Sequence, residues 1–287
     1  MHNTFKPYKH IESAIKIPEV EFLISTMNRT DLDFLNSIFK HYDLDELDIL
    51  IINQTSKEKL LHSKQKNIRV INAFEKGLSR SRNLAIRNAI GELCFITDDD
   101  VEYLPNAINI AKQAYNDFPE SALISFQYLR ENDEIFKKYL KKSGYQNTLL
   151  HKQSISSIEV TICTKKIKDK GILFNTAFGL GARFKSSEEQ VFRDDLIKAG
   201  LKVAFVTEPI VKHYGETSVA AEHSKAYTQA LVAQKYLLHK NLIYVWLIRY
   251  IWLLLKRKVI KVSQITKIWN YGVEAVQDYK KCVASQY

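Results

Sequence analysis

The sequence predicts an α/β fold in which helices flank a mixed, mainly parallel β-sheet. Short apolar runs alternate with segments of helical spacing, which is typical of βαβ units. The apolar runs end in polar clusters at residues 26–29, 53–55 and 98–100, and ligands of parallel sheets bind at the carboxyl ends of strands. With 46% apolar and 26% charged residues, the 287-residue chain can bury a large core.

Five apolar runs in the first half of the chain predict buried strands. They are residues 20–26, 47–53, 68–72, 93–97 and 121–127. Helical spacing predicts the helices between them, at residues 32–39, at residues 79–90, and from Pro105 to about residue 116. Because helices separate most consecutive strands, we expect crossover connections and parallel pairing.

The second half of the chain is less regular. Residues 132–153 are polar and rich in lysine, which indicates a surface loop and helix. The elements expected next are a strand at 155–163, a glycine-rich segment at 174–184, a capped helix at 187–198, a strand at 201–207, and a helical region from 218 to about 260. We therefore expect a main domain at residues 1–217 and a helical extension at residues 218–287.

The chain is basic, and most of its excess charge lies near the C-terminus. Lys and Arg outnumber Asp and Glu by 42 to 32, which gives a formal net charge of +10. Residues 240–287 contain nine basic and two acidic residues, so they contribute 9 − 2 = +7 of that charge. The remainder of the chain is close to neutral, which argues against a nucleic-acid partner for the main domain.

The cysteines and the N-terminal segment favour a cytoplasmic protein. Cys94, Cys163 and Cys282 are far apart and lack the spacing of metal ligands or of a disulfide framework. The first twenty residues lack the apolar core of a signal peptide. A reducing cytoplasm is the simplest expectation.

Three consecutive carboxylates, Asp98, Asp99 and Asp100, follow the predicted strand at 93–97. Like charges this close repel one another, and a divalent cation would compensate for the repulsion. In an extended segment Asp98 and Asp100 point one way and Asp99 the other. The alternative is a solvated loop in which one Asp caps the next helix, but capping needs one carboxylate and not three.

Several motifs in fixed order resemble the family 2 glycosyltransferases of GT-A fold. They are a strand ending in the turn Thr26–Arg29, the helix start Gly77-Leu78-Ser79-Arg80-Ser81-Arg82-Asn83, the pair Gly91-Glu92, and Asp98-x-Asp100. The match covers roughly the first hundred residues. It continues more loosely through Gly179–Ala182, Ser187–Glu189 and His213.

The resemblance implies a binding site for a nucleotide-sugar donor, with contacts at Thr26, Asn28, Arg29, Asn53, Arg82, Asp98 and Asp99. It implies that manganese or magnesium binds Asp98 and Asp100, with a contact from His213. The family usually has an Asp at the end of the second strand, where it binds the base or ribose, but this chain has Asn53. An amide can still hydrogen-bond a pyrimidine edge, so we expect a retained pocket with an altered nucleotide preference.

The resemblance also places the general base at the start of the helix at 187–198. Glu189 aligns with the usual base, and Glu188 is the second candidate; the alternative is that both complement the helix dipole. We expect Asp194 and Asp195, one turn further on, to face solvent. The glycines Gly179 and Gly181 are expected in an acceptor-side loop, where they let the backbone approach a sugar, and the alternative is a simple turn.

Residues 242–255 are very apolar but too short to span a bilayer. The basic run Lys256-Arg257-Lys258 follows them. This combination suits a helix that lies in the interface of an anionic membrane. A core or homodimer helix with a charged exit is the alternative.

Together these features predict an inverting, metal-dependent glycosyltransferase at the inner face of the plasma membrane. Its acceptor is expected to be a glycan or polyprenyl-linked glycan in capsule, O-antigen or exopolysaccharide synthesis. Two other functions stay open, a catalytically inactive sugar-binding scaffold subunit and a sugar nucleotidyltransferase. The latter usually has a glycine-rich phosphate loop after the first strand, which residues 27–31 do not form.

Overall fold

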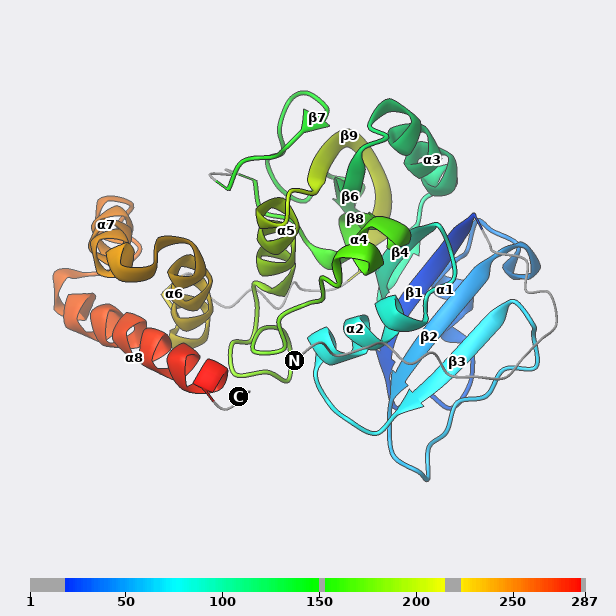
Figure 1. The fold of residues 1–287 in the computed structure, drawn as a ribbon, viewed down its shortest axis with the longest axis horizontal. Coiled ribbons are helices and arrows are strands. Elements are labelled where there is room, and N and C mark those ends of the chain that lie inside the picture. Colours follow the sequence, from blue (N-terminus) through cyan, green and yellow to red (C-terminus); the bar gives the residue numbers. More distant parts are fainter. Residues whose placement is uncertain (1–18, 150–152, 215–222, 285–287) are drawn as a thin grey trace.

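The computed structural model describes residues 19–149, 153–214 and 223–284. Within them the strands form one sheet of nine, in the order β3-β2-β1-β4-β8-β6-β9-β5, with β7 paired to β9 (Figure 1). The strands are β1 (Val20–Met27), β2 (Asp48–Gln54), β3 (Ile68–Ala73), β4 (Leu93–Asp98), β5 (Val101–Tyr103), β6 (Ser121–Arg130), β7 (Gly144–Tyr145), β8 (Val160–Cys163) and β9 (Lys202–His213).

Helices flank this sheet and extend beyond it. They are α1 (Phe34–Ile38), α2 (Leu78–Asn88), α3 (Ala107–Asp117), α4 (Thr164–Lys170), α5 (Glu188–Lys198), α6 (Lys225–His239), α7 (Ile243–Lys256) and α8 (Ile265–Ala284). Short 3-10 turns lie at Leu44–Glu46, Ser157–Glu159, Lys240–Leu242 and Val262–Gln264. The predicted α/β class with a mixed, mainly parallel sheet is confirmed.

The first half of the sheet is parallel, as expected. Strand β1 pairs in parallel with β2 and β4, and β2 pairs in parallel with β3. The register places Thr26 beside Asn53, Asn53 beside Asn72, and Ser25 beside Asp98. The carboxyl ends of these four strands therefore meet at one edge of the sheet, where the polar clusters lie.

The second half of the sheet is mixed. Strand β8 lies antiparallel between β4 and β6, whereas β6 and β9 are parallel. The strand expected at 155–163 is shorter, because residues Ser157–Glu159 form a 3-10 turn. Strand β9 is longer than expected and, past register irregularities beside β6, pairs antiparallel with β5. This extension carries His213 to the aspartate cluster.

Alternating side chains of the parallel strands fill two cores. On one face, Phe22 of β1 packs against Phe95 and Tyr103 with ring centroids 4.6 and 4.9 Å apart, beneath α1 and α3. On the other face, Leu23 belongs to the core beneath α2, α4 and α5, where Phe192 is also buried. Burial on both faces explains why these strands are continuous apolar runs.

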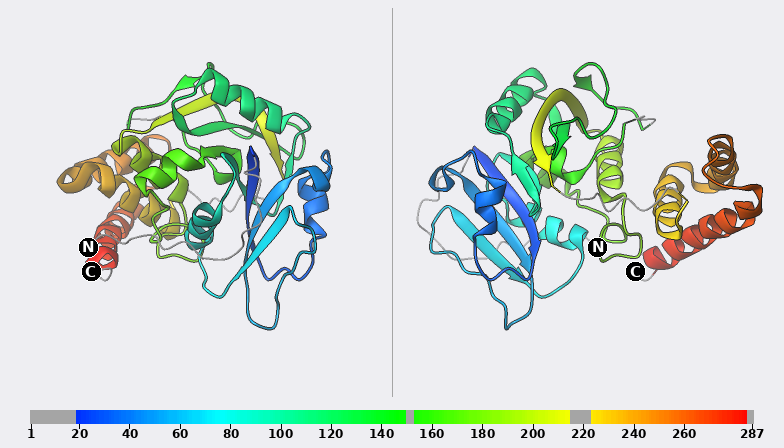
Figure 2. Two further views of the ribbon diagram at one scale, coloured as in Figure 1. Left: turned by 45° about the vertical axis from the view of Figure 1, so that its right-hand side comes forward. Right: turned by 180° about the vertical axis from the view of Figure 1, so that it is seen from behind.

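The C-terminal helices form a third core with the glycine-rich segment. Residues of α6, α7 and α8 pack with Phe178, Phe184 and Val191. Figure 2 shows these helices at the end of the molecule away from β3. The proposed boundary at residue 217 lies outside the described residues. Across the described ranges, none of the helices combines the length and apolarity needed to cross a membrane.

Three expectations about the second half are wrong. The described residues of 132–153 contain no helix. Lys137 and Tyr139 donate hydrogen bonds to the buried Glu159, and residues 144–145 form strand β7, which pairs with β9. Asp194 is 2% exposed and pairs with Arg193 instead of facing solvent. Ser187 makes no side-chain cap to α5. Helix α8 lies within the residues 218–287 where a helical extension is expected, beyond the limit of about residue 260 given for the helical pattern.

Candidate active site

The turn after β1 folds back against the end of β2. Asn28 has a left-handed φ of +56°, which Asn tolerates better than most residues, and its N–H donates to the Gln54 carbonyl at 3.0 Å. The N–H of Arg29 donates to Oδ1 of Asn53 at 3.0 Å. The predicted donor residues Thr26, Asn28 and Arg29 therefore stand together above β1 and β2.

The aspartates do not form an extended run. Asp99 and Asp100 occupy a turn between β4 and β5, so the alternation assumed for three consecutive side chains does not apply. Asp99 accepts hydrogen bonds from the Thr26 hydroxyl and from Nε and Nη2 of Arg29, the latter two at 3.1 and 2.9 Å. Asp99 thus joins the β4 end to the β1 turn.

Asp100 and His213 are the pair best placed to share a divalent ion. Their Oδ2 and Nε2 atoms lie 3.3 Å apart, and the hydrogen bond to Asp100 raises the pKa of His213. Asp98, the third predicted ligand, instead accepts from Nη2 of Arg82 at 2.9 Å and from the Ser157 hydroxyl at 3.0 Å. Among the described residues, no group of three or more His, Cys, Asp and Glu could hold a metal.

This donor set still fits a magnesium or manganese ion that arrives with a diphosphate. Such ions commonly bind through one or two protein ligands and complete their shell with substrate phosphates and water. Asp100 is 56% exposed at its side chain, so its oxygens are open to such a complex.

One buried cation holds three carboxylates at the centre of the site. The Arg82 side chain is 1% exposed, and its Nη1 lies 3.2 Å from Oε1 of Glu188 and 3.2 Å from Oε1 of Glu189. Its Nη2 holds Asp98. Nε of Arg82 and Oε2 of Glu188 have no hydrogen-bond partner among the described residues. With all three carboxylates ionised, the cluster has one positive and three negative charges, and it brings together residues up to 107 positions apart.

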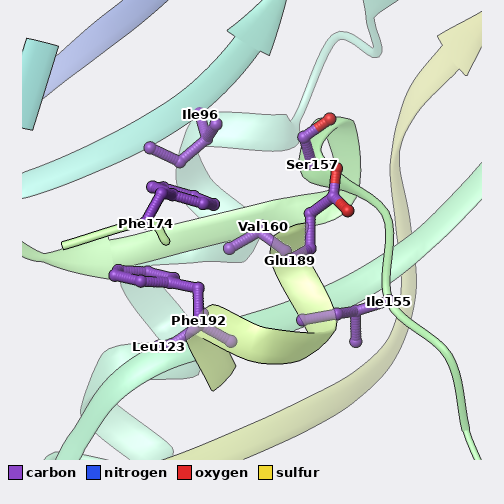
Figure 3. A pocket seen from close by; sticks show the side chains of 8 residues that line it. All are labelled: Ile96, Leu123, Ile155, Ser157, Val160, Phe174, Glu189 and Phe192. Atoms are coloured by element: carbon purple, nitrogen blue, oxygen red, sulfur yellow. The ribbon is translucent and has the colours of Figure 1, made fainter. Parts of the chain in front are cut away.

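Burial and a neighbouring negative charge make Glu189 a weaker acid than an ordinary glutamate. Its pKa is raised to about 8, chiefly by burial and then by the charge of Glu188, and the Arg82 cation offsets part of this. Figure 3 shows its carboxylate on the same side of a small pocket as the Ser157 hydroxyl. The other residues that line the pocket are apolar: Ile96, Leu123, Ile155, Val160, Phe174 and Phe192.

The glycine-rich segment packs directly on α2 and on Glu188 of the carboxylate cluster around Arg82. Gly179 has a φ of +102°, and a Cβ placed there would lie 3.0 Å from Oγ of Ser79 and 3.3 Å from Cδ of Glu188. Gly181 has a φ of +80°, and its Cβ would lie 3.1 Å from Cα of Gly77. Side chains larger than hydrogen would therefore push this loop away from α2 and Glu188.

The Asn53 side chain does not reach the surface at the carboxyl edge of the sheet. It is 0% exposed, and its Nδ2 donates to the carbonyl of Arg29 and to Oδ1 of Asn72, both at 3.0 Å. Asn72 in turn exchanges two hydrogen bonds with the backbone of Leu61. Both N–H groups of the amide are used by the protein and the side chain is fully buried, so a pyrimidine edge could bind it only by displacing one of these hydrogen bonds.

Sequence reasoning missed two residues of the site. Ser157 holds Asp98, and Asn72 holds Asn53. The pattern Ser156-x-x-Glu159 could have revealed the turn that carries Ser157, because it forms a capping box. No local signal marks Asn72, since its role depends on pairing between β2 and β3.

Residues 23–189 match the family model described as glycosyl transferase family 2. No curated protein matches the chain. Several similar solved structures are of TarS from S. aureus. TarS 1-349 in complex with UDP-GlcNAc has a TM-score of 0.57 at 16% identity, covering 91% of this chain and 80% of that chain.

A second structure, TarS 1-349 in complex with UDP, has a TM-score of 0.51 at 16% identity and covers 76% of this chain. The aligned part spans 65% of that chain, and against a longer TarS structure it spans 40%. At such identities the likeness shows a shared fold, which is the GT-A fold. The family match covers more than half of the chain and includes the aspartate turn, Arg82 and Glu188. The chain therefore belongs to glycosyl transferase family 2.

Proposed function

We propose that this protein is an inverting glycosyltransferase that uses a nucleotide-sugar donor and Glu189 as the general base. The observation that carries the proposal is the position of Glu189. Its carboxylate lies 3.2 Å from Arg82, which also holds Asp98 at the carboxyl edge of the sheet. A base with a pKa near working pH accepts a proton efficiently without being permanently protonated.

The proposed step moves one proton and one glycosyl group. The acceptor hydroxyl gives its proton to a Glu189 oxygen as its own oxygen bonds to the anomeric carbon. The bond from that carbon to the diphosphate breaks, and its electron pair leaves with the nucleotide. Attack from the face opposite the leaving group inverts the anomeric centre. Glu188 is the second candidate, but it is 5% exposed and packed against Gly179.

The donor would bind over the ends of β1 and β4. Thr26, Asn28 and Arg29 line the β1 turn, and the positive Arg29 is 40% exposed at its side chain. A bound divalent ion would neutralise negative charge on the leaving diphosphate, and Asp100 and His213 are the residues that would hold it. The TarS structures contain UDP and UDP-GlcNAc, which supports a nucleotide-sugar donor for this chain as well.

For the biological setting we propose synthesis of a bacterial surface polysaccharide, such as a capsule, O-antigen or exopolysaccharide. The acceptor would be a glycan or a polyprenyl-linked glycan, and the protein would act in the cytoplasm, peripheral to the plasma membrane. Residues 1–217 would bind donor and catalyse transfer, with residues 218–287 as a helical extension.

The test is a transfer and donor-hydrolysis assay with a panel of UDP, GDP, CMP and dTDP sugars. Glu189→Gln should keep donor binding, measured by calorimetry, and lose turnover by about 10²–10⁴-fold, the usual size of a general-base effect. Asp195→Asn is the matched control, because Asp195 lies on the same helix and pairs only with Lys198 in the described structure. A normal rate for Glu189→Gln would assign the base elsewhere.

A further inference from the structure

We propose that the exposed face of α7 binds the surface of an anionic membrane, with the helix lying parallel to it. This α7 face consists of Val245, Ile248 and Trp252, which are 65, 60 and 55% exposed, together with Leu242 just before the helix, which is 66% exposed. The inference rests on the peripheral membrane location in the proposed function and names the surface that would bind lipid, and it depends on the surface of α7 and not on the residues around Arg82.

Helix α7 is apolar on two opposite sides. Ile243, Leu247, Ile251 and Leu254 are buried against the neighbouring helices. Because the helix has 3.6 residues per turn, Val245, Ile248 and Trp252 form a stripe on the side that no described residue covers. A helix that only packed on α6 and α8 would have polar residues along that stripe.

Basic residues border the stripe. Arg249 and Lys256 lie on the same side of α7 and are exposed, as are Lys258 and Lys261 just beyond it. The sequence from residue 240 to residue 273 has no acidic side chain. Lys256 lies 5.2 Å from the ring centre of Trp252. Long cationic side chains beside apolar ones can reach lipid phosphates while the apolar groups enter the acyl boundary.

Charge also favours lipid over a second copy of the chain. A two-fold dimer through the α7 face would bring the same patch of both copies together. Arg249 and Lys256 would then face their own counterparts, and no acidic residue of the stripe would compensate for the repulsion. An anionic bilayer offers complementary charge to the same surface.

The length of α7 fixes its orientation. Its 14 residues extend about 21 Å at 1.5 Å per residue, whereas the hydrocarbon core of a bilayer is about 30 Å thick. The helix would therefore lie in the interface. Its buried side belongs to the same core as Phe178 and Phe184 of the glycine-rich segment, so that segment would lie on the side of α7 away from the lipid.

The test is co-sedimentation of the full chain with phosphatidylcholine vesicles, with and without phosphatidylglycerol. Binding should require phosphatidylglycerol and weaken with salt. The double substitution Ile248→Ser with Trp252→Ser should weaken binding at least tenfold, because two apolar side chains that would be buried in the lipid interface are lost. Lys256→Gln with Lys258→Gln should weaken it about fivefold per charge removed. Ile135→Ser, at a position 53% exposed on a remote loop, is the matched control and should change nothing.

Circular dichroism checks that each variant folds, and the donor-hydrolysis assay reports the catalytic site separately. Loss of vesicle binding with unchanged hydrolysis supports the inference. Equal binding to both kinds of vesicle, or no binding by the unaltered chain, overturns it. A dimer in sedimentation velocity that Trp252→Ser dissociates would also overturn it, because the α7 face would then be a protein interface.

Discussion

Asn53→Asp restores the residue usual in the resembling family, yet the structure predicts that it damages this protein. Asn53 accepts from the N–H of Arg29 and donates to the Arg29 carbonyl and to Oδ1 of Asn72, all at 3.0 Å. Because a backbone N–H can only donate, Oδ1 of Asn53 must face it, and this fixes the orientation of the amide. An Asp would keep that bond and turn its second oxygen towards two other oxygens.

The expected destabilisation is large. Two hydrogen bonds are lost and two acceptors face a buried carboxylate at a position that is 0% exposed. Leaving a buried polar group unsatisfied costs about 1–3 kcal/mol, and an uncompensated buried charge about 3–5 kcal/mol. We expect a loss of about 3–5 kcal/mol of unfolding free energy for Asn53→Asp, against about 2 kcal/mol for Asn53→Ala.

The penalty should depend on pH. Burial without a cation raises the folded-state pKa of the introduced Asp above its unfolded value of about 3.9. The variant is therefore least stable above that folded pKa, and it recovers stability as pH falls through it, because a protonated carboxyl donates one hydrogen bond. Asn53→Ala has no such group, so its stability relative to the unaltered chain should not change with pH.

The assay is urea unfolding followed by circular dichroism at about pH 8 and about pH 5, with UDP binding measured by calorimetry at both. The Asn53→Asp deficit should shrink at the lower pH, and UDP binding at the higher pH should weaken as the Arg29 turn loosens. If Asn53→Asp is as stable as the unaltered chain at about pH 8 and binds UDP more tightly, the side chain faces the nucleotide and the reasoning is wrong.

Three further predictions concern the catalytic side. Transfer should rise with pH and level off above about 8, the pKa of Glu189, since the base must be ionised; a flat profile from about pH 6 to about pH 9 would contradict this. Gly179→Ala should cost about 1–3 kcal/mol of unfolding free energy and lower turnover, because its Cβ would crowd Ser79 at a φ of +102°; unfolding midpoints and initial rates check this. EDTA or Asp100→Ala should abolish transfer, and His213→Ala should raise the metal concentration needed; full activity without metal would exclude the proposed ion.

Much of the fold could be predicted because its signals are local. The buried strands are apolar runs, and the helices between them have regular spacing. The turns that follow β1 and β4 could be located as well, because polar residues follow directly on the apolar runs of these two strands. Segments without such periodicity were predicted poorly: residues 132–149 are held by contacts with the distant Glu159, and β9 continues past its apolar run because β6 and β5 pair with it.

The α/β class, the edge of the sheet that carries the polar residues, and the candidate carboxylates could all be predicted from the amino-acid sequence. The hydrogen-bond and ion-pair partners of those carboxylates follow from the folded arrangement. It turned Asp98 towards Arg82 and not towards Asp100, buried Asn53 against Asn72, and gathered Glu188 and Glu189 on the same arginine. The physical reason is that a strand end is specified by neighbouring residues, whereas the charge, burial and pKa of a side chain are set by groups up to 107 positions away in the chain.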